Sequence, residues 1–376
     1  MKKAVCISCT HHYHERVAPV EAALRAAGYE ISYITSDYNH YTKQHYRVTD
    51  LPHCEQLPTL AYTKNISPQR MYSHFRFAKD AFARVEQLQP DLVYAEVPPN
   101  SLCRVAARYK KRHPEVKLIF DIFDLWPESF PNHKAKALLA LPFRVWGSFR
   151  NKGLPKADLV LTECDLFREK LAPYLENTRQ QTLYLCHPGA TTQVAKALPE
   201  QAEIHLCYLG FINNLIDIPT ISALLGQLRQ LRPVVLHIIG DGETREAFIS
   251  AVEAAGVKVE FHGKIYDSAQ KQAIFDRCSF GLNIMKDSVC VGLTMKSLDY
   301  FGGALPIINT IGGDTQRFVE IRGVGINVCR ENLAETARKI AEITPAQQLK
   351  MGESALQLFN ELFTQEVFQQ TLLSVL

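Results

Sequence analysis

Short apolar runs alternate with longer stretches whose apolar residues recur at helical spacing. In the first half, runs at 4–8, 29–34, 92–94 and 117–123 flank or follow helix-length segments at 17–27, 68–87 and 101–112. Strands joined by crossover helices pair in parallel, because each helix returns the chain to the edge where the next strand begins. The pattern therefore predicts an α/β fold with a parallel sheet between layers of helices.

The same alternation restarts after residue 203. Apolar runs are found at 204–209, 234–239, 259–261, 280–284 and 305–308, and helix-length segments at 219–231, 244–255, 269–277 and 294–301. Between the halves, residues 186–201 carry Pro188, Gly189 and Pro199 with little periodicity, which is typical of a linker. We expect two domains, at 1–190 and 191–357, followed by a C-terminal helix within 358–376.

Composition narrows the class of protein. The 376 residues are 47% hydrophobic and 22% charged, which is ordinary for a soluble protein with sizeable hydrophobic cores. The net charge of +3 is too small to indicate nucleic-acid binding. The N-terminus lacks the long apolar run of a signal peptide, and no stretch reaches the roughly 18 to 20 apolar residues of a membrane helix. The ten cysteines are then best explained as reduced thiols, so we expect a cytoplasmic protein.

Three strand-to-helix turns of the second half are rich in glycine. Gly210 follows one expected strand, Gly240-Asp241-Gly242 another, and Gly263 a third. Glycine permits a positive φ and a close approach of ligand to backbone, and a helix that begins there directs free N–H groups at an anion. Tight chain reversal alone would explain any one of these turns, whereas three in one domain favour a phosphate ligand.

The most informative segment begins at Val291. Gly292-Leu293-Thr294-Met295 opens a helix that carries Lys296 in its first turn and Asp299 three residues later. Both side chains project from one helical face near the positive end of the helix dipole. A lysine beside helix N–H groups suits a diphosphate, and a carboxylate one turn further suits ribose hydroxyls. An ordinary capped helix remains the alternative.

This segment, with Tyr208 to Gly210, Gly240 to Gly242 and Phe261 to Gly263, resembles the nucleotide-sugar site of GT-B glycosyltransferases related to family 4. The resemblance implies two Rossmann-like domains that face each other across a cleft. It implies that Asp299 binds the ribose, that Lys296 and the N–H groups of Gly292, Leu293, Thr294 and Met295 hold the diphosphate, and that the main chain at Lys264 and Ile265 contacts the base. It also implies a UDP- or GDP-sugar donor with no further cofactor and no metal.

The segment departs from the family pattern in three ways. Val291 stands where many members have a glutamate that contacts the donor sugar, and Asp299 replaces a second glutamate. Residues 213–216 lack the basic side chains that often follow the first glycine turn, so Lys264, Lys286 or an N-terminal arginine would have to supply that charge. The sequence Gly-Gly-Ala at 302–304 shifts the expected glycine by one place.

In the first half, the strand at 117–123 runs into Asp124-Leu125-Trp126-Pro127-Glu128. Acids at the carboxyl end of a parallel strand lie where ligands bind in open sheets. The segment is similar to the Asp-x-Trp-Pro-Glu element of family 4 relatives, and we take Asp124 as the polar group beside the anomeric carbon, with Glu128 second. A turn-capping Asp124 and a solvated Glu128 are the structural alternative.

The loop after the first strand also follows a carboxyl end. Here His11, His12 or Arg16 could contact a phosphate or the acceptor. Cys9 with nearby histidines could instead hold zinc, although no distant second pair of ligands is evident.

Basic residues interleaved with Trp146 and Phe149 across 130–154 suit a membrane surface. A helix packed on the domain with its cations in water is the alternative. Membrane contact would imply a lipid-linked acceptor and a location at the inner face of the membrane.

These observations together predict a transferase that moves a sugar from a nucleoside diphosphate sugar to an acceptor hydroxyl of a glycan or lipid-linked glycan. The resemblance implies retention of configuration, polysaccharide or glycoconjugate synthesis, and return of the C-terminal helix to the first domain. Two alternatives stay open. One is a nucleotide-sugar epimerase, and the other is a non-catalytic partner subunit, which the loss of a glutamate at Val291 would suit.

Overall fold

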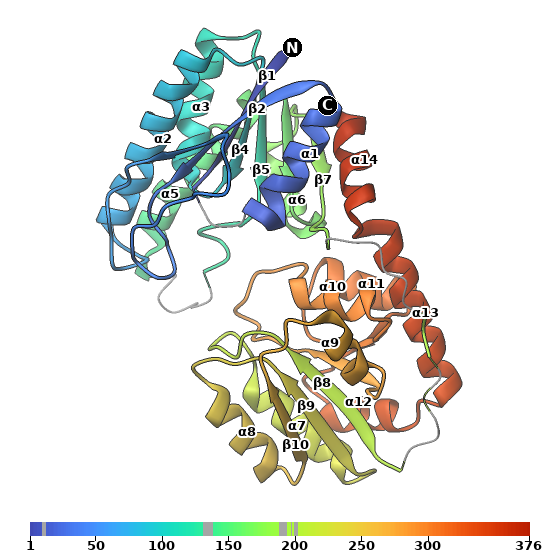
Figure 1. Ribbon diagram of the computed structural model, residues 1–376. Coiled ribbons are helices and arrows are strands. Elements are labelled where there is room, and N and C mark those ends of the chain that lie inside the picture. The colour runs from blue at the N-terminus through green and yellow to red at the C-terminus, as the bar shows by residue number, and fades with distance from the viewer. Residues whose placement is uncertain (10–12, 131–137, 188–193, 197, 199–201) are drawn as a thin grey trace. The chain divides into compact units, whose positions relative to one another are not determined.

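The structure, a computed structural model, describes residues 1–9, 13–130, 138–187, 194–196, 198 and 202–376. The chain forms two compact units. In Figure 1 the first runs from blue to green and also includes the red helix at the C-terminus, and the second runs from yellow-green to orange-red. Unit 1 comprises Met1–Cys186 and Gln365–Leu376, and unit 2 comprises His187–Thr364. The expected boundaries were 190 and 357. The second crossing comes later because helix α13 (Pro345–Leu362) belongs wholly to unit 2.

Unit 1 is built on a seven-stranded sheet in the order β3-β2-β1-β4-β5-β6-β7, in which every pair is parallel. Its strands are β1 (Lys2–Ser8), β2 (Tyr29–Ser36), β3 (Cys54–Leu57), β4 (Leu92–Val97), β5 (Lys117–Ile122), β6 (Leu159–Thr162) and β7 (Gln180–Thr182). All carboxyl ends therefore lie along one edge, where the connecting loops carry the candidate chemistry.

Helices cover both faces of this sheet. They are α1 (Ala18–Ala26), α2 (Pro68–Leu88), α3 (Asn100–Arg112), α5 (Ala140–Asn151), α6 (Asp165–Leu171) and α14 (Gln365–Val375), with a single π-helical turn η1 (Tyr13–Val17) and two short 3-10 helices, η2 (Leu154–Lys156) and η3 (Ala172–Tyr174). Figure 1 shows α1 and α14 side by side on one face and α2 and α3 on the other. Leu24 of α1 and Phe368 of α14 join Tyr94 and Ile119 of the sheet in one apolar core. Burial of this apolar face anchors the C-terminal helix to unit 1.

Unit 2 repeats the plan with six parallel strands in the order β10-β9-β8-β11-β12-β13. The strands are β8 (Ile204–Leu209), β9 (Val234–Ile239), β10 (Lys258–Gly263), β11 (Phe280–Asn283), β12 (Ile307–Asn309) and β13 (Gly325–Asn327). The helices are α7 (Ile218–Arg229), α8 (Arg245–Ala254), α9 (Ser268–Phe275), α10 (Met295–Gly302), α11 (Asp314–Arg322), α12 (Leu333–Ala341) and α13.

The core of unit 2 lies between its sheet and α7, α8 and α12. Leu206, Leu236 and Leu282 of the sheet pack against helix residues such as Leu224 and Phe248, all of them fully buried. Near-continuous apolar strands of this kind are typical of parallel sheets covered on both faces. The sequence pattern located these strands for that reason.

Four strands were not predicted, namely β3, β6, β7 and β13. Three of them, β3, β7 and β13, lie at sheet edges and have three or four residues, of which few or none are buried. A run that short shows no measurable period, and its pairing depends on a neighbouring strand far away in sequence. Among the helices formed by the described residues, none has the length and apolar character that crossing a membrane requires.

Candidate active site

Helix α10 begins where its sequence predicts. Thr294 is its N-cap, with an extended backbone and a side-chain oxygen that accepts a hydrogen bond from the Ser297 N–H. The hydroxyl of Thr294 also lies 2.8 Å from Oγ of Ser297 and 3.3 Å from Oδ1 of Asn283. An N-cap of this type satisfies one of the free N–H groups and leaves the others of the first turn directed outward.

A ladder of three asparagines, of which Asn283 and Asn309 are buried, fixes this helix start to the sheet. Asn283, Asn309 and Asn327 stand side by side in register on β11, β12 and β13. Nδ2 of Asn283 donates to Oδ1 of Asn309 at 3.1 Å, and Nδ2 of Asn309 donates to Oδ1 of Asn327 at 2.9 Å. Asn283 also donates to Oγ of Ser297. Amide side chains that satisfy one another at strand ends hold the loops there in one geometry.

Tyr300 secures the same helix from its other side. Its hydroxyl accepts the Leu209 N–H at 2.8 Å and lies 3.2 Å from the Cys207 carbonyl oxygen, both on β8. The start of α10 and the Gly210 turn that follows β8 are thus parts of one rigid assembly.

Lys296 occupies the first turn of α10, and its ammonium lies 4.8 Å from the ring centroid of Tyr208. The side chain is half-buried, and burial lowers the pKa of Lys296 from its ordinary value to about 8. Over the described ranges, no carboxylate lies within ion-pair distance of this ammonium. A desolvated cation without an anionic partner, beside helix N–H groups, is a suitable site for a phosphate.

The glycines of the turns divide into two kinds. A Cβ on Gly240 would lie 2.0 Å from the Gly210 carbonyl oxygen, and one on Gly242 would lie 2.2 Å from that of Ile212, so both are required by close backbone packing. Gly210 and Gly263 have φ of +117° and +68°, and a Cβ there would meet no atom within 4 Å. Only this second pair has open space through which a ligand can approach.

Asp241 and the residues after β10 lie at the same edge of the sheet. Asp241 accepts the Gly242 N–H at 2.8 Å and pairs with Arg245 at 3.1 Å, so its side chain already has two local partners. Lys264 is exposed and Ile265 is half-buried directly after β10. Their main chain follows the open Gly263 turn.

Asp299 is an ion-pair partner in the structure. Its carboxylate contacts Nζ of Lys271, from α9, and lies 3.8 Å from Nε2 of His187. Sequence reasoning missed Lys271, because the two residues are 28 positions apart and only the packing of α9 on α10 brings them together. The second carboxylate oxygen of Asp299 has no hydrogen-bonded partner within the part of the chain that the structure describes.

In unit 1, Asp124 and Glu128 have different environments. Asp124 accepts a hydrogen bond of 2.7 Å from the Ser129 hydroxyl, and burial raises the pKa of this carboxyl above its ordinary value. Glu128 binds both terminal nitrogens of Arg150, at 2.7 and 3.0 Å. Arg150 is fully buried and also donates to the Trp126 carbonyl oxygen at 3.1 Å. Glu128 therefore stabilises the Trp-Pro corner through its ion pair, whereas Asp124 has no ion pair among the described residues and stays a candidate reactive group.

Arg16 is not a ligand contact in this structure. Its Nε and one terminal nitrogen donate to both oxygens of Asp121 at 2.7 and 2.8 Å, and both side chains are wholly buried. Its other terminal nitrogen donates to the Leu183 carbonyl oxygen. The prediction for Arg16 is corrected to a structural role, because burial and full pairing remove it from ligands. His11 and His12 lie outside the described residues.

The segment at 130–154 is described from residue 138 onward, apart from Phe130. Phe143 and Trp146 of α5 are buried in unit 1, whereas Leu138, Leu141 and Val145 are exposed. The prediction of a membrane contact is therefore wrong for Trp146, which packs against Trp126, as Phe143 also does. Residues 131–137, which include His133, Lys134 and Lys136, lie outside the description.

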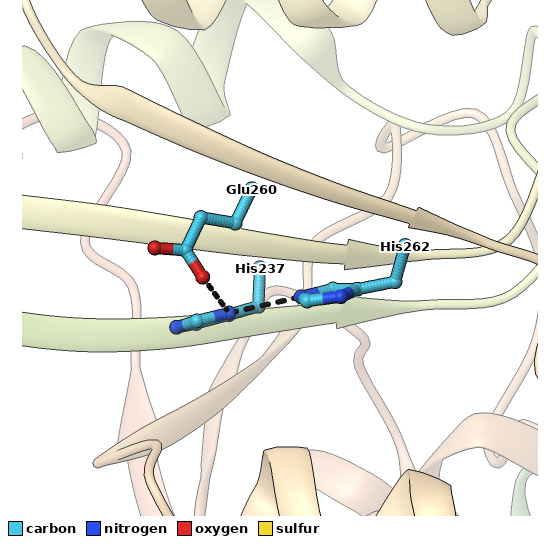
Figure 2. A group of neighbouring side chains, drawn as sticks. All are labelled: His237, Glu260 and His262. Carbon is cyan, nitrogen blue, oxygen red and sulfur yellow. Dashed lines mark hydrogen bonds and ion pairs between the residues drawn. The ribbon is translucent and has the colours of Figure 1, made fainter.

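One further cluster has the residue types of a metal centre. His205, His237 and His262 stand on β8, β9 and β10, with Nδ1 to Nε2 distances of 2.9 and 3.0 Å between neighbours. Figure 2 shows His237 and His262 in line, with Glu260 3.3 Å from Nδ1 of His237. The ligand atoms of His237, Glu260 and His262 lie within 4.8 Å of one another, close enough to hold one ion.

Hydrogen bonding explains this cluster better than a metal does. The ring planes differ by only 22° and 12° while the centroids are 5.2 and 5.3 Å apart, the geometry of imidazoles joined edge to edge. Lys258 and Arg277 already approach Glu260, at 2.9 and 3.8 Å, and two cations oppose a third positive charge. The sequence analysis did not single out these histidines, since their alignment depends on strand register.

No protein-family model matches the sequence, and no curated protein matches it. Solved structures do. Sucrose-phosphate synthase from Thermosynechococcus elongatus superposes with a TM-score of 0.72 at 16% identity, covering 99% of this chain and 97% of the other. Anabaena HepE in complex with UDP and glucose gives 0.63 at 13% identity over 100% and 99%. WaaG, a glycosyltransferase involved in lipopolysaccharide biosynthesis, gives 0.61 at 14% over 99% and 98%. The chain therefore has the GT-B fold of two Rossmann-like units with parallel sheets.

Proposed function

We propose that this GT-B chain is a glycosyltransferase that moves a sugar from a nucleoside diphosphate sugar to an acceptor hydroxyl. The observation that carries the proposal is Lys296, a half-buried ammonium without an anionic partner in the described residues, fixed in the first turn of α10. The solved structures of HepE with UDP, with UDP and glucose, and with UDP-glucose support the choice of ligand.

The proposed donor site combines four elements of unit 2. Lys296 and the N–H groups at the start of α10 hold the diphosphate, and the open turns at Gly210 and Gly263 let it approach the backbone. Asp299 accepts the ribose hydroxyls through the carboxylate oxygen that Lys271 does not bind. Lys271 holds the other carboxylate oxygen of Asp299 and so orients this side chain.

The proposed mechanism of sugar transfer follows from where charge develops as the donor bond breaks. The bond between the anomeric carbon and the diphosphate oxygen breaks, a new bond forms to the acceptor oxygen, and the acceptor hydroxyl gives its proton to the departing diphosphate. The leaving diphosphate gains negative charge, which Lys296 and the helix N–H groups stabilise in a fixed arrangement. Asp124 is the proposed negative group beside the anomeric carbon, which becomes positive during transfer. Retention of configuration, as in family 4, is part of the proposal.

Nucleotide binding is the first test. UDP and GDP are added to the purified chain, and thermal stability and calorimetric affinity are measured for the wild type, Lys296→Ala and Lys339→Ala. Lys339 is 61% exposed on α12 and pairs with Glu335, so it is a matched surface control. We expect a shift with one nucleotide that Lys296→Ala reduces and Lys339→Ala leaves unchanged. A wild-type chain that binds no nucleoside diphosphate contradicts the proposal.

Product analysis separates the transferase from its rivals. UDP- and GDP-sugars are incubated with and without acceptors, and released nucleotide and the recovered sugar are quantified. A transferase releases nucleotide faster when an acceptor is present. An epimerase would convert the donor without releasing nucleotide, and a non-catalytic partner subunit would do neither.

A role at the membrane, in the synthesis of polysaccharide or glycoconjugate, extends this proposal. Leu138, Leu141 and Val145 form an exposed apolar strip along the start of α5, with exposed Arg144 beside it. An apolar strip flanked by a cation suits the surface of an anionic bilayer. A lipid-linked acceptor would then be presented to unit 1 from the membrane.

A further inference from the structure

Arg70 is a buried cation of unit 1 that forms no ion pair with a carboxylate among the described residues. It lies in the first turn of α2, is 7% exposed, and has no carboxylate within ion-pair distance among the residues that the structure describes. One terminal nitrogen donates to the Asn65 carbonyl oxygen at 2.9 Å, and Nε is buried with no hydrogen-bond partner. Burying an uncompensated charge is costly, so such a group is usually retained for a ligand.

Three aromatic rings surround the guanidinium. Its central carbon lies 5.3 Å from the ring of Trp126, 5.6 Å from that of Trp146 and 6.0 Å from that of Tyr62. Stacking on aromatic faces offsets part of the desolvation cost. These contacts leave the buried Nε donor without a hydrogen-bond partner among the described residues.

A second cation meets the same aromatic ring. Nζ of Lys43 lies 4.9 Å from the ring centroid of Tyr62 and contacts the Asn65 side chain, so Asn65 binds both cations. Lys43 has φ of +59°, a left-handed conformation that is unfavourable for a residue with a side chain. The loop after β2 thus holds this ammonium in place at an energetic cost.

The electrostatic state of the neighbouring groups is consistent with excess positive charge. Burial and the charge of Arg70 lower the pKa of Lys43, and burial and the nearby cations lower the pKa of His74, which lies one turn after Arg70 on α2. Nδ1 of His74 is buried without a hydrogen-bond partner. Asp124 is the carboxylate that interacts with Arg70 at longer range, and it accepts a hydrogen bond from the Ser129 hydroxyl.

We propose that Arg70 and Lys43 bind a phosphate group of the acceptor at the carboxyl edge of the first sheet. An arginine fork with a second cation, a lysine ammonium, is a combination that recognises phosphate oxygens. Calling this ligand the acceptor rests on the proposed function, because Asp124, the proposed reactive carboxylate, lies at the same edge. The substrate class is thus a phosphorylated acceptor, either a soluble sugar phosphate or a lipid-linked phosphate.

Tryptophan fluorescence can report ligand binding at this site. Its only two tryptophans are Trp126 and Trp146, and both contact the Arg70 guanidinium. Inorganic phosphate and glucose 6-phosphate are titrated against the full-length protein at constant ionic strength, and tryptophan emission is recorded. We expect a saturable change with phosphate and none with chloride. A wild-type chain with no saturable change contradicts the proposal.

Variants assign the change to Arg70. Arg70→Met should weaken phosphate binding at least about tenfold, since a charge-assisted hydrogen bond contributes about 1.5 to 3 kcal/mol. Lys43→Gln should weaken it less. Arg76→Met is the matched control, because Arg76 lies on the same helix, is 51% exposed and pairs with Asp80. If Arg70→Met binds phosphate as tightly as the wild type, the assignment is overturned. If Arg70→Met does not fold, the same comparison is made with Arg70→Lys, which keeps the charge.

Two further experiments distinguish a lipid phosphate from a soluble one, and the phosphate site from the proposed nucleotide site. Co-sedimentation with phosphatidylcholine vesicles, with and without phosphatidic acid, gives Arg70-dependent binding if a lipid phosphate is the ligand, whereas saturation by glucose 6-phosphate alone indicates a soluble acceptor. UDP affinity is measured for Arg70→Met, and phosphate binding for Lys296→Ala. Normal UDP binding with lost phosphate binding in Arg70→Met supports two independent sites. If the wild-type chain bound no UDP, the proposed function would be wrong, whereas the phosphate site would still be supported by the phosphate titration.

Discussion

The two carboxylate oxygens of Glu128 bind the two terminal nitrogens of the buried Arg150, at 2.7 and 3.0 Å. This pairing joins the Trp-Pro corner after β5 to helix α5, so Glu128 has a bracing role that its position in the sequence did not reveal.

Glu128→Ala should therefore act mainly on stability. It leaves the fully buried Arg150 unpaired, which we expect to lower the free energy of unfolding by about 2 kcal/mol, less than for a wholly buried pair because Glu128 is 37% exposed. Urea denaturation measures the change. A variant with wild-type stability and no turnover would instead assign Glu128 to the chemistry.

Deprotonation of the Lys296 ammonium should weaken nucleotide binding. Burial lowers the pKa of Lys296 to about 8, so the ammonium that attracts a diphosphate is present below pH 8 and is lost above it. The dissociation constant for UDP should rise by up to about tenfold per pH unit above 8. Calorimetry between pH 7 and 9.5 tests this, and Lys296→Met should show a flat profile. A wild-type profile that matches the variant would exclude this ammonium from the site.

Asp299 should distinguish nucleotides by their ribose. Asp299→Ala is expected to weaken UDP binding about tenfold, because a charged hydrogen-bond acceptor is lost. The same substitution should leave binding of 2′,3′-dideoxyuridine diphosphate nearly unchanged, since that ligand has no ribose hydroxyls to donate. Calorimetry with both ligands provides the comparison, and equal losses for the two would show that Asp299 acts only through Lys271 and the fold.

The histidine row should make unit 2 sensitive to acid. Burial lowers the pKa of His237 from 6.5 to about 4, so in the unfolded chain this ring takes up a proton at a higher pH than in the folded one. The free energy of unfolding should fall as the pH drops from about 6.5 to 4, by at most about 3 kcal/mol from this group. Denaturation of the wild type and of His237→Leu at pH 7 and 4.5 isolates the contribution. A pH dependence that is the same in both would contradict it.

The wholly buried pair of Arg16 and Asp121 should be structural. Arg16→Met strands a buried carboxylate and is expected to cost about 3 to 5 kcal/mol. Combining it with Asp121→Asn should cost less than the two single substitutions added together, because no buried charge then remains. Thermal and urea denaturation of the three variants give the coupling. Full stability in Arg16→Met, with lost ligand binding, would return Arg16 to the site.

Local rules determined a large part of this protein from its sequence. The apolar runs of β8 and β9 were long and each ended at a glycine turn, so their carboxyl ends followed directly. Thr294 marks the start of α10, because a capping hydroxyl and the following amphipathic turn are neighbours in the chain. The shared helical face of Lys296 and Asp299 followed from their three-residue spacing, which needs no knowledge of the rest of the fold, whereas their contacts with a nucleotide stay a prediction.

Tertiary structure alone decided which distant residues share an environment. Arg16 meets Asp121 across 105 positions, Asp299 meets Lys271 across 28, and Arg70 meets Trp126 and Trp146 only after α2 and α5 pack on unit 1. Whether a cation is paired, stacked or left for a ligand depends on these contacts, because burial and nearby charges set its energy. Periodicity carries no such information, since it describes one element and not its neighbours in space.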